Sequence, residues 1–166
     1  MKKMKVILII AAVLIVLGAV WFLVKPGMPG PGSVLDGDGM INPYAISLFS
    51  YDRGGGMVNA RYRVTLEANE LTVEERTGQE TTIKKYEVPD ETISSIEKVL
   101  YDSGMKKGQG DFPENEYQAL DAETVSVIVD YSDGAHIQFD SNQKVPDEYW
   151  EAVDETIRLL ESIADK

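Results

Sequence analysis

Apolar and polar residues alternate along most of the chain after about residue 45. Tyr62, Val64, Leu66 and Ala68 fall on one side of an extended chain, and charged or hydroxyl residues fall on the other. A period of two residues is typical of a β-strand with one buried face. Similar patterns predict further strands near residues 45–51, 71–73, 81–88, 124–131 and 135–141. We therefore expect an antiparallel sheet of about six strands.

The turn of the last hairpin can be predicted from the faces of its two strands. A two-residue loop would set apolar residues opposite polar ones. A three-residue loop, residues 132–134, sets Val129 opposite Ile137 and Val127 opposite Phe139. Because only this register matches the apolar faces, we expect the three-residue loop, with its glycine in the left-handed conformation of a bulged turn.

Two helices are predicted by a second period, close to 3.6 residues. Both begin with the tetrapeptide Val-Pro-Asp-Glu, at residues 88–91 and 145–148. Proline suits a helix start, and the acids complement the positive end of the helix dipole. Gly104 is a natural stop for the first helix. The apolar stripes are Ile93, Ile96 and Leu100 in the first helix, and Trp150, Val153, Ile157, Leu160 and Ala164 in the second. We expect Trp150 to be the central residue of the core.

Each predicted helix follows a predicted hairpin, which gives two ββα units at residues 71–103 and 124–163. Aligning their Val-Pro-Asp-Glu starts superposes Ile93 on Trp150 and Ile96 on Val153. We expect an α+β domain in which both units share one antiparallel sheet, with the two helices on one face. A distant duplication and convergence on a common strand-to-helix turn both explain the likeness.

A different pattern precedes this domain, because residues 6–24 contain no charged side chain. As a helix this segment would be about 28 Å long, close to the thickness of a bilayer core. We expect a transmembrane signal-anchor helix, which makes the membrane a partner through residues 6–24. The alternative is a secretory signal cleaved after Gly18 or Ala19, which would leave the apolar residues 21–24 on the mature start.

Charge on either side of the apolar segment predicts its orientation. Lys2, Lys3 and Lys5 precede the segment, whereas Lys25 alone follows it closely. By the positive-inside rule, residues 1–5 are cytoplasmic and the rest of the chain is outside the cell. Residues 25–43 are rich in proline and glycine and predict a tether. Residues 44–166 then form the extracytoplasmic domain.

The part of the chain beyond the apolar segment is strongly acidic. After Lys25 lie all 28 acidic residues and 12 of the 16 basic ones, so the net charge of residues 26–166 is near −16 against −12 for the whole chain. Such a surface repels phosphate backbones, so we expect no binding to nucleic acid. The chain contains no cysteine. Lipid attachment at a cysteine, disulfides and thiol catalysis are therefore excluded.

The tether contains a sequence similar to half of a calcium-binding loop. Asp36, Asp38 and Asn42 match positions 3, 5 and 9 of the dockerin and EF-hand loops. Val34 and Ala45 then occupy positions 1 and 12, where these loops usually carry acids. We therefore interpret the segment as an acidic linker and keep the three residues as weak metal candidates.

Catalytic patterns are poorly represented. The chain has one histidine, His136, which falls on the polar face of its strand, and no serine in a G-x-S-x-G setting. Nucleophilic triads and zinc sites are therefore not expected, and no cofactor motif is present. Pairs of carboxylates could still perform acid–base chemistry. The sequence does not single out such a pair.

Two loops are candidates for partner binding. The first joins the first two strands and contains Tyr51, Arg53, Gly54, Gly55 and Gly56, where glycines would allow close approach of a partner. A simple hairpin connection is the alternative.

The second candidate loop, residues 106–122, lacks periodicity and contains Phe112 and Tyr117 among acids. Long loops in compact domains often carry function, although this one could also bridge the two units.

Three short segments resemble a known group of proteins. They are residues 47–51 with the glycines that follow, Tyr-Ser-Asp-Gly at residues 131–134, and residues 141–146 leading into the second helix. Together they resemble uncharacterised membrane-anchored or lipoprotein-like extracytoplasmic domains of Gram-positive bacteria, over residues 47–160. The resemblance implies an exported, anchored and non-enzymatic protein. We thus expect an interaction or sensing domain with an unknown extracytoplasmic protein or cell-wall partner. A small wall-associated enzyme or inhibitor that uses surface carboxylates is the alternative.

Overall fold

The computed structural model describes residues 42, 44–55, 60–108, 112–116 and 123–165. The expected transmembrane segment, residues 6–24, and nearly all of the expected tether lie outside the described residues. Within the described part of the chain, no helix is both long enough and apolar enough to cross a membrane.

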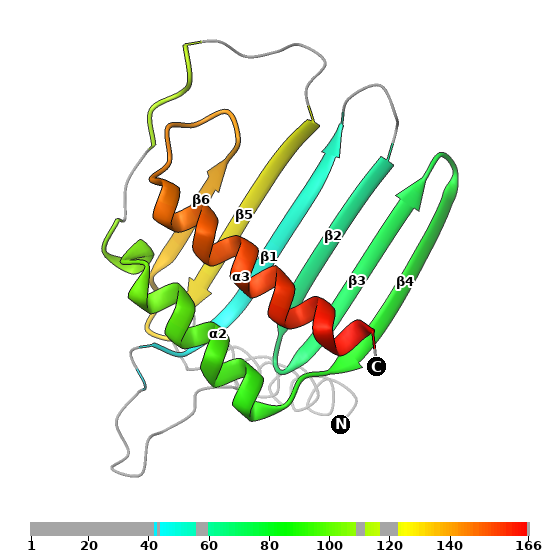
Figure 1. The fold of residues 1–166 in the computed structure, drawn as a ribbon, viewed down its shortest axis with the longest axis horizontal. Helices are drawn as coiled ribbons and strands as arrows, with labels where there is room; N and C mark the ends of the chain where they lie inside the picture. The colour runs from blue at the N-terminus through cyan, green and yellow to red at the C-terminus, as the bar shows by residue number, and fades with distance from the viewer. Residues whose placement is uncertain (1–41, 43, 56–59, 109–111, 117–122, 166) are drawn as a thin grey trace, which may run out of the picture.

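Six strands form one antiparallel sheet, and two helices lie across one of its faces (Figure 1). The strands are β1 (Ile46–Gly55), β2 (Ala60–Glu67), β3 (Glu70–Thr77), β4 (Glu80–Glu87), β5 (Glu123–Tyr131) and β6 (His136–Asp140). The helices are α2 (Asp90–Asp102), the short 3-10 helix η1 (Met105–Lys107) and α3 (Asp147–Ala164). The strand order is β4-β3-β2-β1-β5-β6, so the predicted α+β class with a six-stranded antiparallel sheet is confirmed.

The hairpin of β2 and β3 has the predicted alternation but a different turn. Val64 pairs with Val73 and Leu66 with Leu71, and all four side chains are buried. The prediction that Ala68 continues the strand is wrong. Ala68 and Asn69 form the two-residue turn, with φ of 48° and 63°. Positive φ at both central positions is the geometry that fits the twist of a tight hairpin.

The predicted turn between β5 and β6 is confirmed. Val129 pairs with Ile137 and Val127 with Phe139, as the matching of faces required. The amide of Tyr131 donates to the carbonyl of Ala135 at 2.9 Å and closes the three-residue loop. Gly134 has φ of 89°, the left-handed conformation expected for it.

Both helices begin at the predicted place. α2 starts at Asp90 and α3 at Asp147, each preceded by a proline with extended ψ of 144° and 140°. α2 ends at Asp102, and Gly104 follows with φ of 75°. The Val-Pro-Asp-Glu signature and the glycine stop therefore predicted these boundaries correctly.

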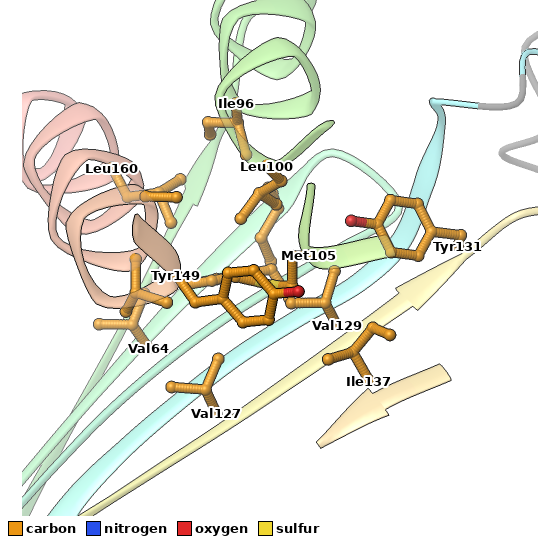
Figure 2. Packing of buried hydrophobic residues seen from close by; sticks show 14 of the residues in the cluster. Val64, Ile96, Leu100, Met105, Val127, Val129, Tyr131, Ile137, Tyr149 and Leu160 are labelled. Carbon is orange, nitrogen blue, oxygen red and sulfur yellow. The ribbon is translucent and has the colours of Figure 1, made fainter. Parts of the chain in front are cut away.

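The core lies between the helices and the sheet, as Figure 2 shows for ten labelled residues. Ile96 and Leu100 of α2 and Leu160 of α3 pack with apolar residues of the central strands. The expectation that Trp150 is the central core residue is wrong. Tyr149 is 7% exposed, whereas Trp150 is only partly buried and packs edge-on against Phe139 with ring centroids 5.0 Å apart. The buried stripe of α3 is thus rotated by about one residue from the predicted stripe. It comprises Tyr149, Ala152, Val153, Thr156 and Leu160.

Candidate binding cleft at the ends of β1, β2 and β3

β1 is longer than the sequence predicted, and this changes the place of the first candidate loop. The strand continues to Gly55, so Tyr51, Arg53 and Gly54 lie within the sheet instead of in a loop. Gly54 has a packing role there, because a Cβ at this position would lie 3.3 Å from the Cγ of Arg61. Gly56 lies outside the described residues.

Near these strand ends the helices no longer cover the sheet (Figure 1), and a cleft opens beside α3. Its volume is about 380 Å³. We call it the α3 cleft; its lining residues are Arg53, Ala60, Arg61, Tyr62, Glu75, Arg76, Thr77, Glu123 and Glu161. The lining includes three arginines and three glutamates, and Arg53 with the glutamates gives the cleft both signs of charge.

Strand pairing builds the floor of the α3 cleft. Arg53 pairs with Tyr62, and Tyr62 pairs with Glu75, so the three residues form one row across β1, β2 and β3. Directly paired residues point to the same side of a sheet. The ring of Tyr51 packs edge-on against Tyr62 with centroids 6.4 Å apart. The row therefore offers a cation, an aromatic ring and an anion side by side.

Tyr62 connects the floor to the helix. Its hydroxyl donates to Oε1 of Glu161 on α3 at 3.1 Å. Burial raises the pKa of Tyr62, and the negative charge of Glu161 raises it further. The hydroxyl therefore stays protonated at physiological pH and acts as a donor that fixes the Glu161 carboxylate.

Arg53 is held at the opposite wall. Its Nε donates to Oε1 of Glu123 at 2.8 Å, and this hydrogen bond is the main reason why the pKa of Arg53 is raised. Both side chains are about half exposed, at 53% and 50%. An exposed pair of this kind contributes at most about 1 kcal/mol to stability. Its consequence here is to orient a guanidinium that remains accessible from solvent.

Arg61 and Arg63 direct their charge to the other face of the sheet. Both bind the carboxylate of Asp52, which is 21% exposed. The hydrogen bond from Arg61 is the largest cause of a lowered pKa at Asp52. Of Arg53, Arg61 and Arg63, only Arg53 forms its ion pair with a residue of the cleft lining, Glu123.

A second, smaller hollow adjoins the α3 cleft along β4. Its volume is about 230 Å³, and it shares Tyr62, Glu75 and Glu161 with the cleft. We call it the β4 hollow; its other lining residues are Val73, Thr82, Lys84, Tyr86, Ala164 and Asp165. The lining thus combines one lysine, Lys84, with three carboxylates, those of Glu75, Glu161 and Asp165.

The second candidate loop is divided by the structure. Phe112 belongs to the aromatic edge of the core, since its ring lies 5.8 Å from Phe139 and 6.1 Å from Tyr149. This packing is a structural role that its sequence position did not reveal. Tyr117 lies outside the described residues.

The weak calcium candidates are also divided. Asp36 and Asp38 lie outside the described residues. The side-chain oxygen of Asn42 accepts a hydrogen bond from the amide of Tyr44 at 3.0 Å, in a turn just before β1. Among the described residues, no group of three His, Cys, Asp or Glu side chains is arranged to hold a metal ion. His136 instead contacts Asp130, with Nδ1 and Oδ1 2.5 Å apart.

Sequence reasoning missed Tyr62, Glu75 and Glu161 as residues of the site. A signal was present in β3, whose helix-facing side changes from Leu71 and Val73 to Glu75 and Thr77. Loss of apolar character along one face indicates where the helix layer stops covering a sheet. The partner of that charged end, α3, could not be assigned from the sequence.

Comparisons with protein-family models and with curated proteins find no match to this chain.

Proposed function

We propose that this chain is a single-pass membrane protein whose extracytoplasmic α+β domain binds a partner and has no catalytic activity. Residues 6–24 would anchor it with the N-terminus in the cytoplasm, and residues 25–43 would form the tether. The apolar run and the lysines before it support this arrangement. Secretion after cleavage of the same segment is the alternative.

The α3 cleft is the observation that carries the binding proposal. Arg53 is oriented by Glu123, and Glu161 is oriented by Tyr62, so the charged groups are held before a ligand arrives. Fixed groups lose less conformational entropy on binding than mobile ones. A guanidinium, carboxylates and one tyrosine within the same cleft fit a polar segment that carries both a carboxylate and an ammonium group. The partner would be an extracytoplasmic protein or a cell-wall component with such a segment.

The position of the cleft agrees with this arrangement. The tether enters at the start of β1, whereas Arg53 lies near its other end. A strand of 10 residues is about 33 Å long. In an anchored protein, the cleft would therefore face away from the membrane, toward the wall.

The alternative function is a small wall-associated enzyme or inhibitor that uses carboxylates. Glu75 and Glu161 both line the α3 cleft and are the best pair for such chemistry. Glu161 is already the acceptor for Tyr62, which favours a positioning role over proton transfer. Release of soluble fragments from purified cell walls by the protein, lost in Glu75→Gln, would support the enzyme instead.

Site-specific photocrosslinking on intact cells tests the binding proposal. A photoreactive phenylalanine analogue at Thr77, in the lining of the cleft, should give a defined adduct. The same analogue at Gln138, exposed on β6 outside the cleft, is the matched control. Arg53→Ala should abolish the Thr77 adduct without unfolding the domain. Equal adducts at Thr77 and Gln138, or an adduct that persists in Arg53→Ala, would contradict the proposal.

The anchor is tested separately by washing membranes with carbonate. We expect the intact chain to stay in the membrane pellet, because a helix through the bilayer core is not extracted by this treatment. A mature form that begins near Ala19 or Val20 in the medium would show that the segment is a cleaved signal.

A further inference from the structure

The two edge strands of the sheet, β4 and β6, differ in length and in the exposure of their side chains. Among the described residues β6 pairs with β5 alone, but residues 113–115 run beside residues 142–144, which follow β6, with amide-to-carbonyl hydrogen bonds from Asn115 to Asn142 and from Lys144 to Pro113, both 2.7 Å. β6 itself has only five residues. β4 has eight residues, and within the described part of the chain it pairs with β3 alone. One side of β4 therefore presents a row of backbone donors and acceptors without a backbone partner among the described residues.

The side chains of β4 are also unusually open. All of its residues except Tyr86 are exposed. Ile83, near the middle of the strand, is 59% exposed and is one of two exposed large hydrophobic residues in the described part. A long edge strand with an exposed aliphatic centre is a template for pairing with another strand.

We propose that β4 pairs antiparallel with β4 of a second copy of this chain, in a register centred on Ile83. The two sheets would join into one, with both helix layers on the same face. A two-fold axis perpendicular to the sheet keeps each side chain on the same face of the sheet in both copies. Residues that lie opposite each other in an antiparallel pair also point to the same face. One residue of β4 must therefore lie opposite itself.

The sequence of β4 selects Ile83 as that residue. A centre at Lys84 or Lys85 would oppose two lysines, which is unfavourable. A centre at Thr82 would leave a ladder of only five strand residues, Glu80 to Lys84. The centre at Ile83 extends the ladder from Glu80 to Tyr86 without opposed like charges. The remaining opposed pairs are Glu80 with Tyr86, Thr81 with Lys85, and Thr82 with Lys84.

Charge in the β4 hollow supports this register. With Thr82 opposite Lys84 of the second copy, that lysine would lie beside the hollow lined by Glu75, Glu161 and Asp165. Thr82 of β4 pairs with Glu75 of β3. Only the small Thr82 side chain would therefore lie between Glu75 and the ammonium group of Lys84 from the second copy. Within the described residues Lys84 has no ion-pair partner, whereas Lys85 pairs with Glu70 at 2.6 Å. The two-fold axis would create the same contact twice.

The ends of the two α3 helices would not collide. Ala164 and Asp165 line the β4 hollow together with Tyr86, and Figure 1 shows the end of α3 at the end of β4 that leads into α2. In the proposed register Tyr86 lies opposite Glu80 of the second copy. The two helix ends would thus be separated by about six residues along the strand, or roughly 20 Å. The α3 cleft, centred on Arg53 and Tyr62, stays accessible in the dimer.

Cysteine crosslinking of the full chain provides a direct test, because the natural chain has no cysteine. Under mild oxidation, Ile83→Cys should form a disulfide-linked dimer, since only a residue opposite itself brings two thiols together. Thr82→Cys and Lys84→Cys should remain largely monomeric. Gln138→Cys, equally exposed on β6, reports random collision.

A charge variant tests the contact at the hollow. Lys84→Glu in the Ile83→Cys background should reduce the crosslinked fraction about tenfold, by adding a carboxylate beside three others. The control is Lys98→Glu on α2, which makes the same change in net charge away from the interface and should leave crosslinking unchanged.

The proposal fails if Ile83→Cys crosslinks no more than Gln138→Cys. It also fails if Thr82→Cys or Lys84→Cys crosslinks instead, because the register would then be wrong. Sedimentation of the unmodified chain as a monomer, at the concentration used for crosslinking, would overturn it as well. These readouts do not depend on a ligand in the α3 cleft.

Discussion

The hairpins β3–β4 and β5–β6 follow the same plan and yet end in very different surroundings. Each is followed by Val-Pro-Asp-Glu and a helix, and each places one strand at an edge of the sheet. On β6, Ile137 and Phe139 are 2% and 1% exposed. On β4, no residue is buried. Similar local sequence signals therefore give two similar hairpins, but the side chains of the two edge strands differ in burial.

The difference follows from side-chain chemistry on the face that the helices cover. β6 presents Ile137 and Phe139 to this face, whereas β4 presents Thr82, Lys84 and Tyr86. Apolar surface on β6 is stabilised by packing against the start of α3, through Tyr149 and Trp150. Without such surface, β4 gains little from a helix above it. The core thus extends to the side chains of β6 at one edge of the sheet, whereas the side chains of β4 at the other edge stay largely exposed.

The largest effect should separate the two edge strands. Phe139→Ala on β6 should lower the free energy of unfolding by about 3–5 kcal/mol, because it leaves a cavity beneath α3. Ile83→Ala on β4 should change it by less than about 0.5 kcal/mol, as expected for an exposed site. Denaturant unfolding of both variants, at a concentration where the chain is monomeric, measures the difference. Similar losses for the two variants would mean that the edges do not differ as described.

A smaller effect should distinguish neighbours on α3. Trp150 is partly buried and retains its contact with Phe139, so Trp150→Ala should cost about 2 kcal/mol, below the range for a fully buried aromatic residue. Tyr149→Ala should cost more, because Tyr149 is 7% exposed and contacts both Phe112 and Phe139. Denaturant unfolding measures the difference, and the midpoint of Tyr149→Ala should be lower than that of Trp150→Ala. A larger loss for Trp150→Ala would restore the role that the sequence suggested for it.

The two helices differ at equivalent positions in a way that pH can reveal. Alignment of the Val-Pro-Asp-Glu starts places Glu97 on Asp154; Glu97 is 8% exposed, whereas Asp154 is exposed. Burial raises the pKa of Glu97, and the hydrogen bond from the amide of Ile46, at 3.2 Å, only partly offsets it. Because the pKa is higher in the folded state, folding favours the protonated acid. Stability from this group is present at low pH and lost as pH rises through the folded pKa.

Glu97→Gln should therefore stabilise the domain by about 1 kcal/mol at pH 7, since the amide keeps an acceptor for Ile46 without a buried charge. The advantage should disappear below the ordinary pKa of glutamate, where the acid is neutral in both states. Asp154→Asn is the matched control and should have no effect. Melting curves at pH 7 and pH 4 measure both variants, and a destabilised Glu97→Gln at pH 7 would contradict the assigned burial cost.

Much of this fold could be predicted because its signals are local. Alternation identified the strands, matching of faces gave the β5–β6 register, and the alignment of helix starts correctly paired buried Ile96 with buried Val153. The burial of Tyr149 instead of Trp150 had no local sequence signal, because it depends on how α3 is rotated above β6. The α3 cleft was missed for the same kind of reason. The cleft lies beside Arg53 and Tyr62, where α3 leaves the sheet uncovered. The path of α3 over the sheet depends on long-range packing and cannot be predicted from a short stretch of sequence.

An effect of similar small size concerns the face of the sheet opposite α2 and α3, where β1 and β2 meet. Asp52 accepts hydrogen bonds from Arg61 and Arg63, and the bond from Arg61 is the main cause of its lowered pKa. Because the pKa of Asp52 is lower in the folded state than in the unfolded state, its ion pairs stabilise the fold at pH values above the unfolded-state pKa. This stabilisation is lost as the pH falls through the folded-state pKa. Asp52→Asn should cost about 1 kcal/mol at pH 7, because the groups are partly exposed and screened by solvent. At pH 2–3 the variant and the natural chain should converge. Glu74→Gln, whose carboxylate lies 3.9 Å from Arg63, should cost less. Equal costs for the two variants would show that general surface charge, and not the bridge at Asp52, holds these strands together on the face opposite α2 and α3.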